Sequence, residues 1–397
     1  RKVMYSCFQK NLKDEMKVAQ LAAYVAEKSA YHHGEVSLAE TIVKLANDYT
    51  GSNNINLLEP CGQFGTRLMG GKDASQTRYI FTKLTKEART IFDPKDDDIL
   101  TYLDDDGRSI EPEYYMPTLP MILVNGSEGI GTGFSCYVPP FNPEDIKQNI
   151  LNYTRGQGLT KMKPWFRGFK GTIQEQDDDS WVTRGVWTTI GKTIKVSELP
   201  PGRWTQDYKE HLDTLVEKKT IGSFTNNSTT ENVDFVIQDY SGKDPVKDLK
   251  LEKTIRCSNM HLFHPTKGIC KYESAEDILK DFINLRVEHY VKRKARLLEI
   301  TKRKAELCSR RAQFVKRVID GDIVVFKRKK QDLEEELSAM FPKVDDSFDY
   351  LLHTRTVDYT EERVAALFKE WEDLNEEVKR LQATGYLDMW KTDIKKL

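Results

Sequence analysis

An arginine followed directly by a tyrosine, Arg78 and Tyr79, ends the loop-like stretch GGKDASQTRY. A phenol with an ordinary pKa of about 10 is ionised in only about one molecule in a thousand at neutral pH, which handicaps a nucleophile by roughly 4 kcal/mol. A neighbouring guanidinium reduces that cost, and it meets the added charge of a phosphoryl transition state with two parallel hydrogen bonds. The pair is therefore either a nucleophilic site for phosphoryl chemistry or an ordinary strand tyrosine beside a surface arginine.

A glycine-rich stretch, GSEGIGTGF at 126–134, has a superficial similarity to a phosphate-binding loop. It lacks the Lys-Ser/Thr that ends such a loop, and a strand pattern rather than a helix follows it, so nucleotide binding is disfavoured. Ile130 is the only large apolar side chain at its tip. An isoleucine there either packs into a core, which the pattern alone favours, or inserts as a wedge between DNA bases.

Acidic and histidine clusters offer no metal site. None of the acidic clusters has the calcium-loop spacing that ends in a bidentate glutamate, so solvated turns are expected at 96–99, 104–107 and 177–180. His261 and His264 have a spacing found in metal sites but no third ligand nearby, which favours a structural pair. A two-metal phosphodiesterase would need a carboxylate cluster that the sequence lacks.

Length and composition set broad limits. A chain of 397 residues is long enough for two or three domains. A mean hydropathy of −0.60 and the absence of any long apolar run predict a soluble protein without a membrane span. The six cysteines form no CxxC pair, which indicates a reducing compartment. The 61 basic and 62 acidic residues nearly cancel, so any binding to nucleic acid must depend on local charge.

The start of the chain predicts two helices and a turn. No signal peptide is visible, and the missing initiator Met suggests a fragment. Apolar spacing predicts helices over 14–28 and 37–49, the second with Ser37 as N-cap and a capping-box glutamate. His32 and His33 lie in the turn between them, where a histidine is usually a cap or a packed polar group. This helix-turn-helix shape is common and only a minority of cases bind DNA.

Further elements follow from pattern. A long polar loop covers 51–78, and the runs RYIFTKLT and KEARTIF then predict a strand and a helix. Strand signals dominate as far as about Val236, in a series of short β-branched runs that comprises MILVNG, GFSCYV, GTIQ, WVTRGVWTTI and KTIKVSEL. These runs predict a mixed domain with much sheet.

The last part of the chain reads as paired long helices. One apolar seam passes through Ile283, Tyr290, Leu297, Ile300, Leu307 and Phe314, and a second runs from Val364 to Leu381. Because a compact module at about 320–358 separates them, the two helices are expected to pair as an antiparallel coiled coil. The basic run at 292–317 is either a solvated helix face or a phosphate-binding face.

The order of several motifs resembles one family. AYHHGE, GSNN, GQFGTR, GGKDASQTRYIFT, PMILVNGSEGIGTGFS and PPFNP are similar, in this order, to the breakage-reunion region of type IIA DNA topoisomerases, in the eukaryotic-type branch. PWFRGFKGTI, SELPPGRWTQ, YLLHTR and DMWKTDIKKL continue the resemblance over nearly the whole chain.

The resemblance implies roles for individual residues. Tyr79 matches the tyrosine that attacks a DNA phosphodiester, links to the 5′ phosphate and releases a 3′ hydroxyl. Arg78 matches the arginine that stabilises the scissile phosphate, and His33 matches a residue near it. Ile130 matches a side chain that intercalates and bends DNA, which replaces the core reading above. Further DNA contacts are expected at His32, Gln63, Arg67 and Lys72.

The resemblance also implies an architecture and partners. The fold class is α+β and multidomain, with a winged-helix (helix-turn-helix) domain at 1–118 that carries the tyrosine and a mixed α/β tower domain at 119–262. A long antiparallel coiled coil follows at 263–397, and it carries a small helical dimerisation module at about 320–358. The implied partners are duplex DNA and a second copy of the chain, without a membrane, in the nucleus or in a viral compartment.

The implied activity is that of an ATP-dependent DNA topoisomerase II, which cleaves both strands, passes a duplex and reseals the break. Mg²⁺ and ATP would be held by Toprim and ATPase domains that these residues do not contain, so the chain alone is expected to dimerise and bind DNA but to cleave it poorly. The alternative is a non-catalytic DNA-binding scaffold that consists of a winged helix and a coiled coil.

Overall fold

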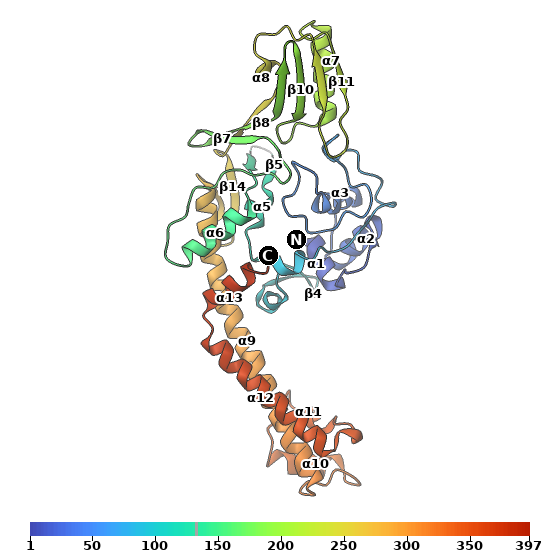
Figure 1. Cartoon of the computed structure of the whole chain (residues 1–397). Coiled ribbons are helices and arrows are strands. Elements are labelled where there is room, and N and C mark those ends of the chain that lie inside the picture. The colour runs from blue at the N-terminus through green and yellow to red at the C-terminus, as the bar shows by residue number, and fades with distance from the viewer. Residues whose placement is uncertain (132–133) are drawn as a thin grey trace. The chain divides into compact units, whose positions relative to one another are not determined.

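The structure is a computed structural model that describes residues 1–131 and 134–397 (Figure 1). Thr132 and Gly133, which belong to the predicted glycine loop and strand, lie outside the described residues. The chain divides into two compact units, Arg1–Val287 with Lys391–Leu397 and Glu288–Trp390. The boundaries fall within helix α9 (Ala275–Ile319) and within helix α13 (Tyr386–Ile394). Each unit is described by itself.

Three helices open the first unit, and they are α1 (Lys2–Lys10), α2 (Val18–Lys28) and α3 (Glu35–Ala46). They lie close together (Figure 1) and share one apolar core. Its buried members include Leu21, Ile42, Phe64 and Ile80. The inward faces predicted for the second and third helices are confirmed at Val18, Leu21, Ala22, Val25, Leu38, Ile42 and Ala46, which are all buried, whereas Leu45, predicted to face inward as well, is half-buried.

Both predicted helix starts were wrong. Met16–Lys17 forms strand β1 rather than helix, because it pairs antiparallel with β2 (Phe81–Thr82). Helix α3 begins at Glu35 with Gly34 at the N-cap, so Ser37 lies inside the helix and is not its cap. A neighbouring strand and an extended glycine therefore set these boundaries, and the capping-box pattern does not.

The predicted strand over RYIFTKLT shortens to β2, because Arg78 and Tyr79 lie in a turn. The following helix is the single turn α4 (Ala88–Ile91). The 3-10 helix η1 (Pro94–Ile99) and the hairpin of β3 (Tyr102–Asp105) and β4 (Arg108–Pro112) come next.

The run MILVNG, predicted as a strand, is helix α5 (Met121–Asn125). A short buried apolar run can be either element, and periodicity does not distinguish them. Here Pro120 precedes the helix and Gly126, at φ 69°, ends it. The chain then turns into the hairpin of β5 (Ser127–Gly131) and β6 (Phe134–Val138).

Sheet dominates the rest of the first unit, as predicted. An antiparallel sheet has the strand order β11-β12-β10-β9, and α7 (Thr205–Glu217) packs against it (Figure 1). We call this sheet together with α7 the α7 sheet. Its strands are β9 (Val186–Ile190), β10 (Thr193–Glu198), β11 (Ser223–Asn226) and β12 (Phe235–Gln238). Tyr208, Leu212 and Phe235 are buried between the helix and the strands.

The remaining elements of this unit comprise a second sheet, a hairpin and short helices. The sheet has the order β13-β8-β7, and the hairpin pairs β14 with β15. Their bounds are β7 (Thr172–Asp177), β8 (Ser180–Arg184), β13 (Glu252–Arg256), β14 (Met260–His264), β15 (Gly268–Tyr272), α6 (Pro143–Tyr153) and α8 (Pro245–Asp248).

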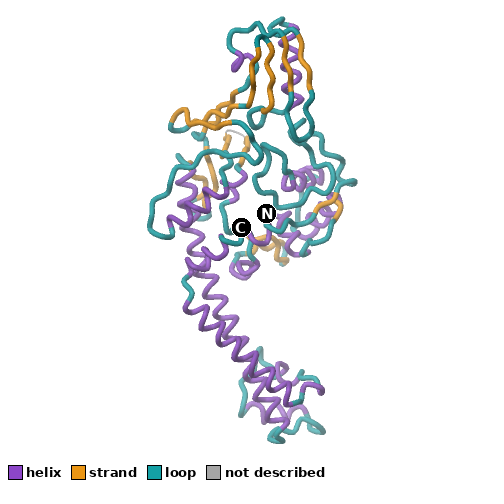
Figure 2. The backbone as a smooth tube through the Cα atoms, viewed as in Figure 1, coloured by secondary structure: helices purple, strands orange, loops and turns teal. Residues whose placement is uncertain are grey.

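The second unit contains two long helices side by side, α9 and α12 (Glu361–Ala383) (Figure 2). They run antiparallel, because Lys294 Nζ donates to the Gln382 carbonyl at 3.0 Å while Cys308 Sγ donates to the Leu367 carbonyl at 3.2 Å. The connecting elements are α10 (Lys330–Ser338), α11 (Asp349–Leu352) and η2 (Thr356–Asp358), and α13 (Tyr386–Ile394) follows α12.

The seam predicted for α9 is only partly correct. Ile283, Tyr290 and Phe314 are buried as predicted, but Leu297, Ile300 and Leu307 are only half-buried. The fully buried line passes instead through Ala305, Cys308, Ala312 and Val315. Small side chains at these positions let the helices approach, so the contact line follows size as well as hydropathy.

None of the helices in the described residues has the length and hydropathy to cross a bilayer.

We predict that Leu21→Ala lowers the free energy of unfolding by about 2–5 kcal/mol, because it leaves a cavity in a core position. Leu21 has no exposed surface. Val36→Ala, at a position 73% exposed on α3, is the matched control and should change the stability by less than about 0.5 kcal/mol. Urea unfolding followed by circular dichroism measures both, and equal losses would contradict the assignment of this core.

Candidate functional site

Arg78 and Tyr79 project from a turn into solvent. The Tyr79 side chain is 65% exposed, which excludes the reading as a packed strand tyrosine. The Arg78 guanidinium lies over its ring, with Cζ 4.9 Å from the ring centroid. The backbone N–H of Tyr79 donates to the Gln76 carbonyl at 2.9 Å and closes the turn. A cation and an accessible phenol therefore lie together, as phosphoryl chemistry requires.

The N-terminus of α2 holds this turn. The first N–H groups of a helix have no partner within the helix. In α2 the N–H of Val18 donates to the Ile80 carbonyl at 3.0 Å, and that of Ala19 donates to the Thr77 carbonyl at 3.1 Å. Ile80 is also buried in the core. The backbone on both sides of Tyr79 is thus fixed while its side chain stays free.

The segment before the turn folds back on itself, and we call residues 62–78 the tyrosine loop. A Cβ added at Gly65, whose φ is +98°, would lie 2.5 Å from the Gly71 Cα, so only glycine allows this approach. Asp73 accepts hydrogen bonds from the Thr66 N–H at 2.8 Å and from its hydroxyl at 2.5 Å. Ser75 N–H donates to the Gln63 carbonyl at 2.9 Å. The loop is therefore ordered although it contains no helix or strand.

The predicted DNA contacts in this loop divide into two kinds. Gln63 and Lys72 are exposed. Arg67, in contrast, is only 6% exposed and forms a buried ion pair with Glu198. Its guanidinium is therefore paired with a carboxylate of the same chain, and the DNA contact of Arg67 stays a prediction. Residue type alone could not reveal this, because a partner 131 residues away decides it.

The two histidines lie beyond the other end of α2. His32 and His33 are exposed in the turn after α2, and the rings of Tyr31 and His33 meet edge to face at 5.4 Å. The Tyr79 turn caps the opposite end of α2, whose 11 residues span about 16 Å. Among the described residues no hydrogen bond joins either histidine to Arg78 or Tyr79.

A cavity of about 680 Å³ lies between α3 and the tyrosine loop. Its charged lining residues are Glu40, Lys44, Lys72 and Arg78. Three cations face one carboxylate there, so the groove beside Tyr79 favours an anion even though the whole chain carries a net charge of only −1.

Ile130 lies at the tip of the β5–β6 hairpin, paired with Ser135 across the strands. It is 88% exposed, so the core reading that the pattern alone favoured was wrong. An exposed isoleucine on a two-stranded hairpin is available for insertion into a partner.

The acidic clusters and the histidine pair give no metal centre. Within residues 1–131 and 134–397, no three His, Cys, Asp or Glu side chains converge to hold an ion. The first cluster is not the solvated turn that was expected: Asp96 is buried and pairs with Arg286 at 2.8 Å, and Asp97 pairs with Arg89 at 2.6 Å. Burial raises the pKa of the Asp97 carboxyl. His264 is buried and accepts from the Thr266 N–H at 3.2 Å, which fits a structural role.

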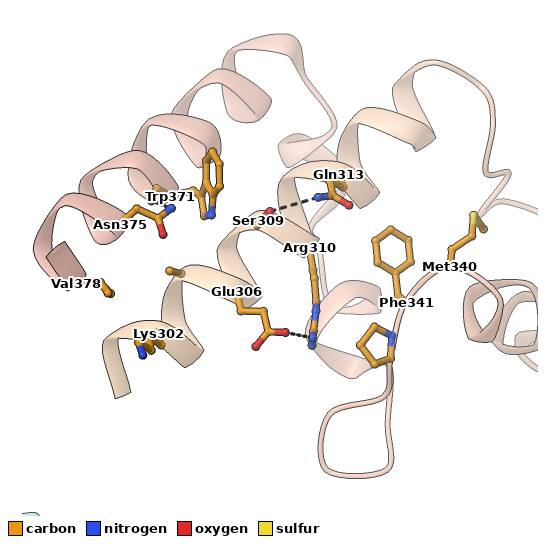
Figure 3. A pocket seen from close by; sticks show the side chains of 12 residues that line it. Lys302, Glu306, Ser309, Arg310, Gln313, Met340, Phe341, Trp371, Asn375 and Val378 are labelled. Carbon is orange, nitrogen blue, oxygen red and sulfur yellow. Dashed lines mark hydrogen bonds and ion pairs between the residues drawn. The ribbon is translucent and has the colours of Figure 1, made fainter. Parts of the chain in front are cut away.

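A separate cavity of about 550 Å³ lies in the second unit, between α9, α12 and the segment 340–342 (Figure 3). Glu306 and Arg310 pair on its α9 wall, and Trp371 lines it from α12. It is lined by Lys302 and Arg310 of the basic run at 292–317, but Arg78, Tyr79 and Ile130 do not line it. The candidate site is therefore the surface around Arg78 and Tyr79.

Comparisons with known proteins show the family of the chain. The family model for the A subunit of DNA gyrase/topoisomerase IV matches residues 1–395. The DNA topoisomerase 2 of Plasmodium falciparum is 38% identical over 448 residues, which cover 100% of this chain and 32% of that protein. The DNA topoisomerase 2 of Saccharomyces cerevisiae is 37% identical, with 100% and 32% covered. The mitochondrial DNA topoisomerase 2 of Dictyostelium discoideum is 39% identical, with the same coverage.

A solved structure is also similar. The crystal structure of the Plasmodium falciparum topoisomerase II DNA-binding, cleavage and re-ligation domain matches with a TM-score of 0.94 at 40% identity, over 100% of this chain and 59% of that one. The likeness therefore covers every element described above. The chain spans about a third of the length of these curated relatives.

We predict that Asp73→Ala loosens the tyrosine loop without unfolding the unit. Losing hydrogen bonds to a charged acceptor costs about 1.5–3 kcal/mol, so the Thr66 amide should exchange with solvent roughly 10- to 150-fold faster. Hydrogen exchange resolved by residue measures this change. Asp14→Ala, an exposed carboxylate outside the loop, serves as the control, and unchanged exchange at Thr66 in Asp73→Ala would show that the loop is held in another way.

Proposed function

The chain belongs to the DNA gyrase/topoisomerase IV family, and on that premise we propose that it is the breakage-reunion part of an ATP-dependent DNA topoisomerase II of the eukaryotic type. It cleaves both strands of a duplex, allows another duplex to pass and reseals the break, which relaxes or decatenates DNA. The observation that carries this proposal is the exposed Tyr79 phenol beside Arg78 on a turn that α2 holds in place.

The reaction exchanges one phosphate ester for another. The Tyr79 oxygen attacks phosphorus and forms a P–O bond while the bond to the 3′ oxygen breaks. The phenolic proton leaves to solvent or a base, and the 3′ oxygen gains a proton. The product is a 5′-phosphotyrosine and a free 3′ hydroxyl. Because the number of phosphodiester links is conserved, the reverse reaction reseals the strand without a further energy source.

Arg78 has one task in this scheme. Its guanidinium donates hydrogen bonds to the non-bridging oxygens as charge develops on them. The chain's described residues do not form a site for the Mg²⁺ that the family implies, so we derive no step through that ion. We propose that a Toprim domain supplies it and that an ATPase domain binds ATP, both in parts of a longer protein beyond these 397 residues.

The finer architecture is part of the same proposal. The helices α1 to α3 with the β1–β2 pair form a winged-helix DNA-binding domain at 1–118, and 119–262 forms a tower domain. The antiparallel α9 and α12 at 263–397 form a coiled coil whose module at 320–358 contacts a second copy of the chain. Duplex DNA lies over His32, His33, Gln63 and Lys72, all of which are exposed.

The proposed setting of the reaction is the nucleus. The relatives are eukaryotic DNA topoisomerase 2 proteins, and one of them is named mitochondrial. A non-catalytic DNA-binding scaffold is the competing candidate. A scaffold without catalytic activity gives no reason for an exposed phenol under a guanidinium, so the role of Tyr79 distinguishes the two candidate functions.

We predict that Tyr79→Phe abolishes covalent capture of DNA, because it removes the attacking oxygen. The full-length protein is incubated with labelled duplex and Mg²⁺ and then denatured, and protein-linked 5′ ends are counted. Tyr386→Phe is the matched control, since Tyr386 is also exposed (40%) but belongs to the second unit. Adducts that persist in Tyr79→Phe would remove this residue from the mechanism and favour the scaffold.

We also predict that Ile130→Ala reduces DNA bending. Wedge insertion costs a few kcal/mol of unstacking and yields a kinked duplex, with a preference for easily deformed steps. Energy transfer between dyes at the ends of a short duplex reports the bend. Ile190→Ala at another hairpin tip is the control, because Ile190 is 79% exposed. Equal bending by Ile130→Ala and wild type would show that another residue bends the DNA.

A further inference from the structure

The tyrosine loop is attached to the α7 sheet by a buried ion pair. Arg67 in the loop is 6% exposed and Glu198, at the end of β10, is 1% exposed. The Arg67 Nη2 pairs with the Glu198 Oε1, and its Nη1 approaches Oε2 at 3.4 Å. A pair removed from water is screened little, and loss of one partner leaves the other charge buried and uncompensated.

Glu198 is itself fixed by the backbone around it. Its Oε1 accepts from the Leu199 N–H at 2.9 Å, and its Oε2 accepts from the Lys170 N–H at 3.4 Å. The position of the carboxylate is therefore fixed by contacts other than the one with Arg67. The ion pair then fixes the position of the loop relative to the α7 sheet.

The N-terminus of α7 binds the same part of the loop. The N–H of Thr205 donates to the Arg67 carbonyl at 3.3 Å, and that of Gln206 donates to the Leu68 carbonyl at 2.9 Å. These are first-turn N–H groups that need a partner outside the helix. Both the side chain and the carbonyl of Arg67 are therefore bound by the α7 sheet.

Trp204 supports the next residues of the loop. A Cβ added at Gly70, whose φ is +62°, would overlap the Trp204 indole, so the bare backbone rests on this ring. Tyr49 meets the same indole edge to face, with 5.7 Å between the ring centroids. The hydrogen bonds of Asp73 and Ser75 described above hold the loop after Gly70. They therefore connect the contact with Trp204 to the end of the loop, where Arg78 and Tyr79 lie.

We propose that Arg67 and Glu198 are positioning residues for DNA cleavage. Through them the α7 sheet sets the orientation of the tyrosine loop, and α2 holds the far side of the Tyr79 turn. The phenolic oxygen is thus aimed by two separate anchors. This inference rests on the proposed function, because its readout is the link between Tyr79 and DNA.

The expected consequence is a defect in rate and not in affinity. A displacement of about 1 Å in a reacting group can cost about 100-fold in rate. Affinity for duplex comes mainly from phosphate contacts, to which the buried Arg67 and Glu198 do not contribute. A loop that is misplaced but still folded therefore binds DNA and cleaves it slowly.

The test uses Glu198→Gln in the full-length protein with Mg²⁺ and a labelled duplex. Glutamine keeps the shape and an oxygen for the Leu199 N–H while it removes the charge. The single-turnover rate of the Tyr79 adduct should fall about 10- to 100-fold, and the Kd for the duplex should stay within about twofold of the wild-type value. Glu252→Gln is the control, since its ion pair with Arg184 is partly exposed and lies outside the loop, and it should leave both values unchanged.

A second variant guards against misfolding. Arg67→Lys keeps the positive charge but cannot form a bidentate pair with the carboxylate. The rate of adduct formation in this variant should therefore lie between those of the wild type and Glu198→Gln. Thermal melting confirms that each variant is folded at the assay temperature.

The possible outcomes separate the two proposals. If the wild-type protein forms no adduct, the proposed function fails and the positioning role fails with it. If the wild-type protein forms the adduct and both variants match its rate, only the positioning role is overturned. It is equally overturned if Kd and rate worsen together, since that pattern reports a general loss of structure.

Discussion

The structure of the candidate site depends on one set of backbone hydrogen bonds, those from the first N–H groups of α2 to the carbonyls of Thr77 and Ile80. They satisfy donors that the helix leaves open and, in the same contact, close the turn that carries Tyr79. Ile80 then enters the core that α2 and α3 share. Because the backbone on both sides of the tyrosine is bound in this way, its phenol is exposed on a turn whose position is fixed. A nucleophile needs this combination, since a mobile side chain would have to be ordered again in each transition state.

A long segment without regular structure usually indicates either function or disorder. In the tyrosine loop the close approach of Gly65 and Gly71, the Asp73 hydrogen bonds and the Arg67–Glu198 pair take the place of a helix or strand. Each of these contacts is costly by itself, because glycines lose more conformational entropy and buried charges lose hydration. Together they give the loop one conformation while leaving its backbone able to run close to a groove that favours anions.

The sequence predicted what depends on spacing and residue type. Apolar periodicity gave the inward faces of α2 and α3, short β-branched runs gave β9 and β10 of the α7 sheet but not β11 and β12, and the order of motifs identified the family. Much of what it missed depends on distant partners. The start of α2 and the burial of Arg67 and Asp96 are decided by segments that fold against them, whereas the start of α3 and the helix α5 were missed for local reasons, an extended Gly34 and a short apolar run. A charged side chain carries no local sign that its partner lies 131 residues away, and a short apolar run fits a helix as well as a strand.

Like Tyr79, Ile130 is a large side chain that the fold leaves exposed, and this exposure connects stability to function. Folding usually buries an isoleucine and gains about 1.5–3 kcal/mol for the side chain. At 88% exposure Ile130 contributes almost none of this to the free chain, although the register of β5 and β6 holds it at a defined place. That unrealised free energy is available to a partner that can bury the side chain, and stacked bases are such a surface. In the function proposed above, this gain would offset part of the cost of kinking the duplex. The exposed side chain at the hairpin tip would then contribute its apolar burial to the DNA complex rather than to the free chain.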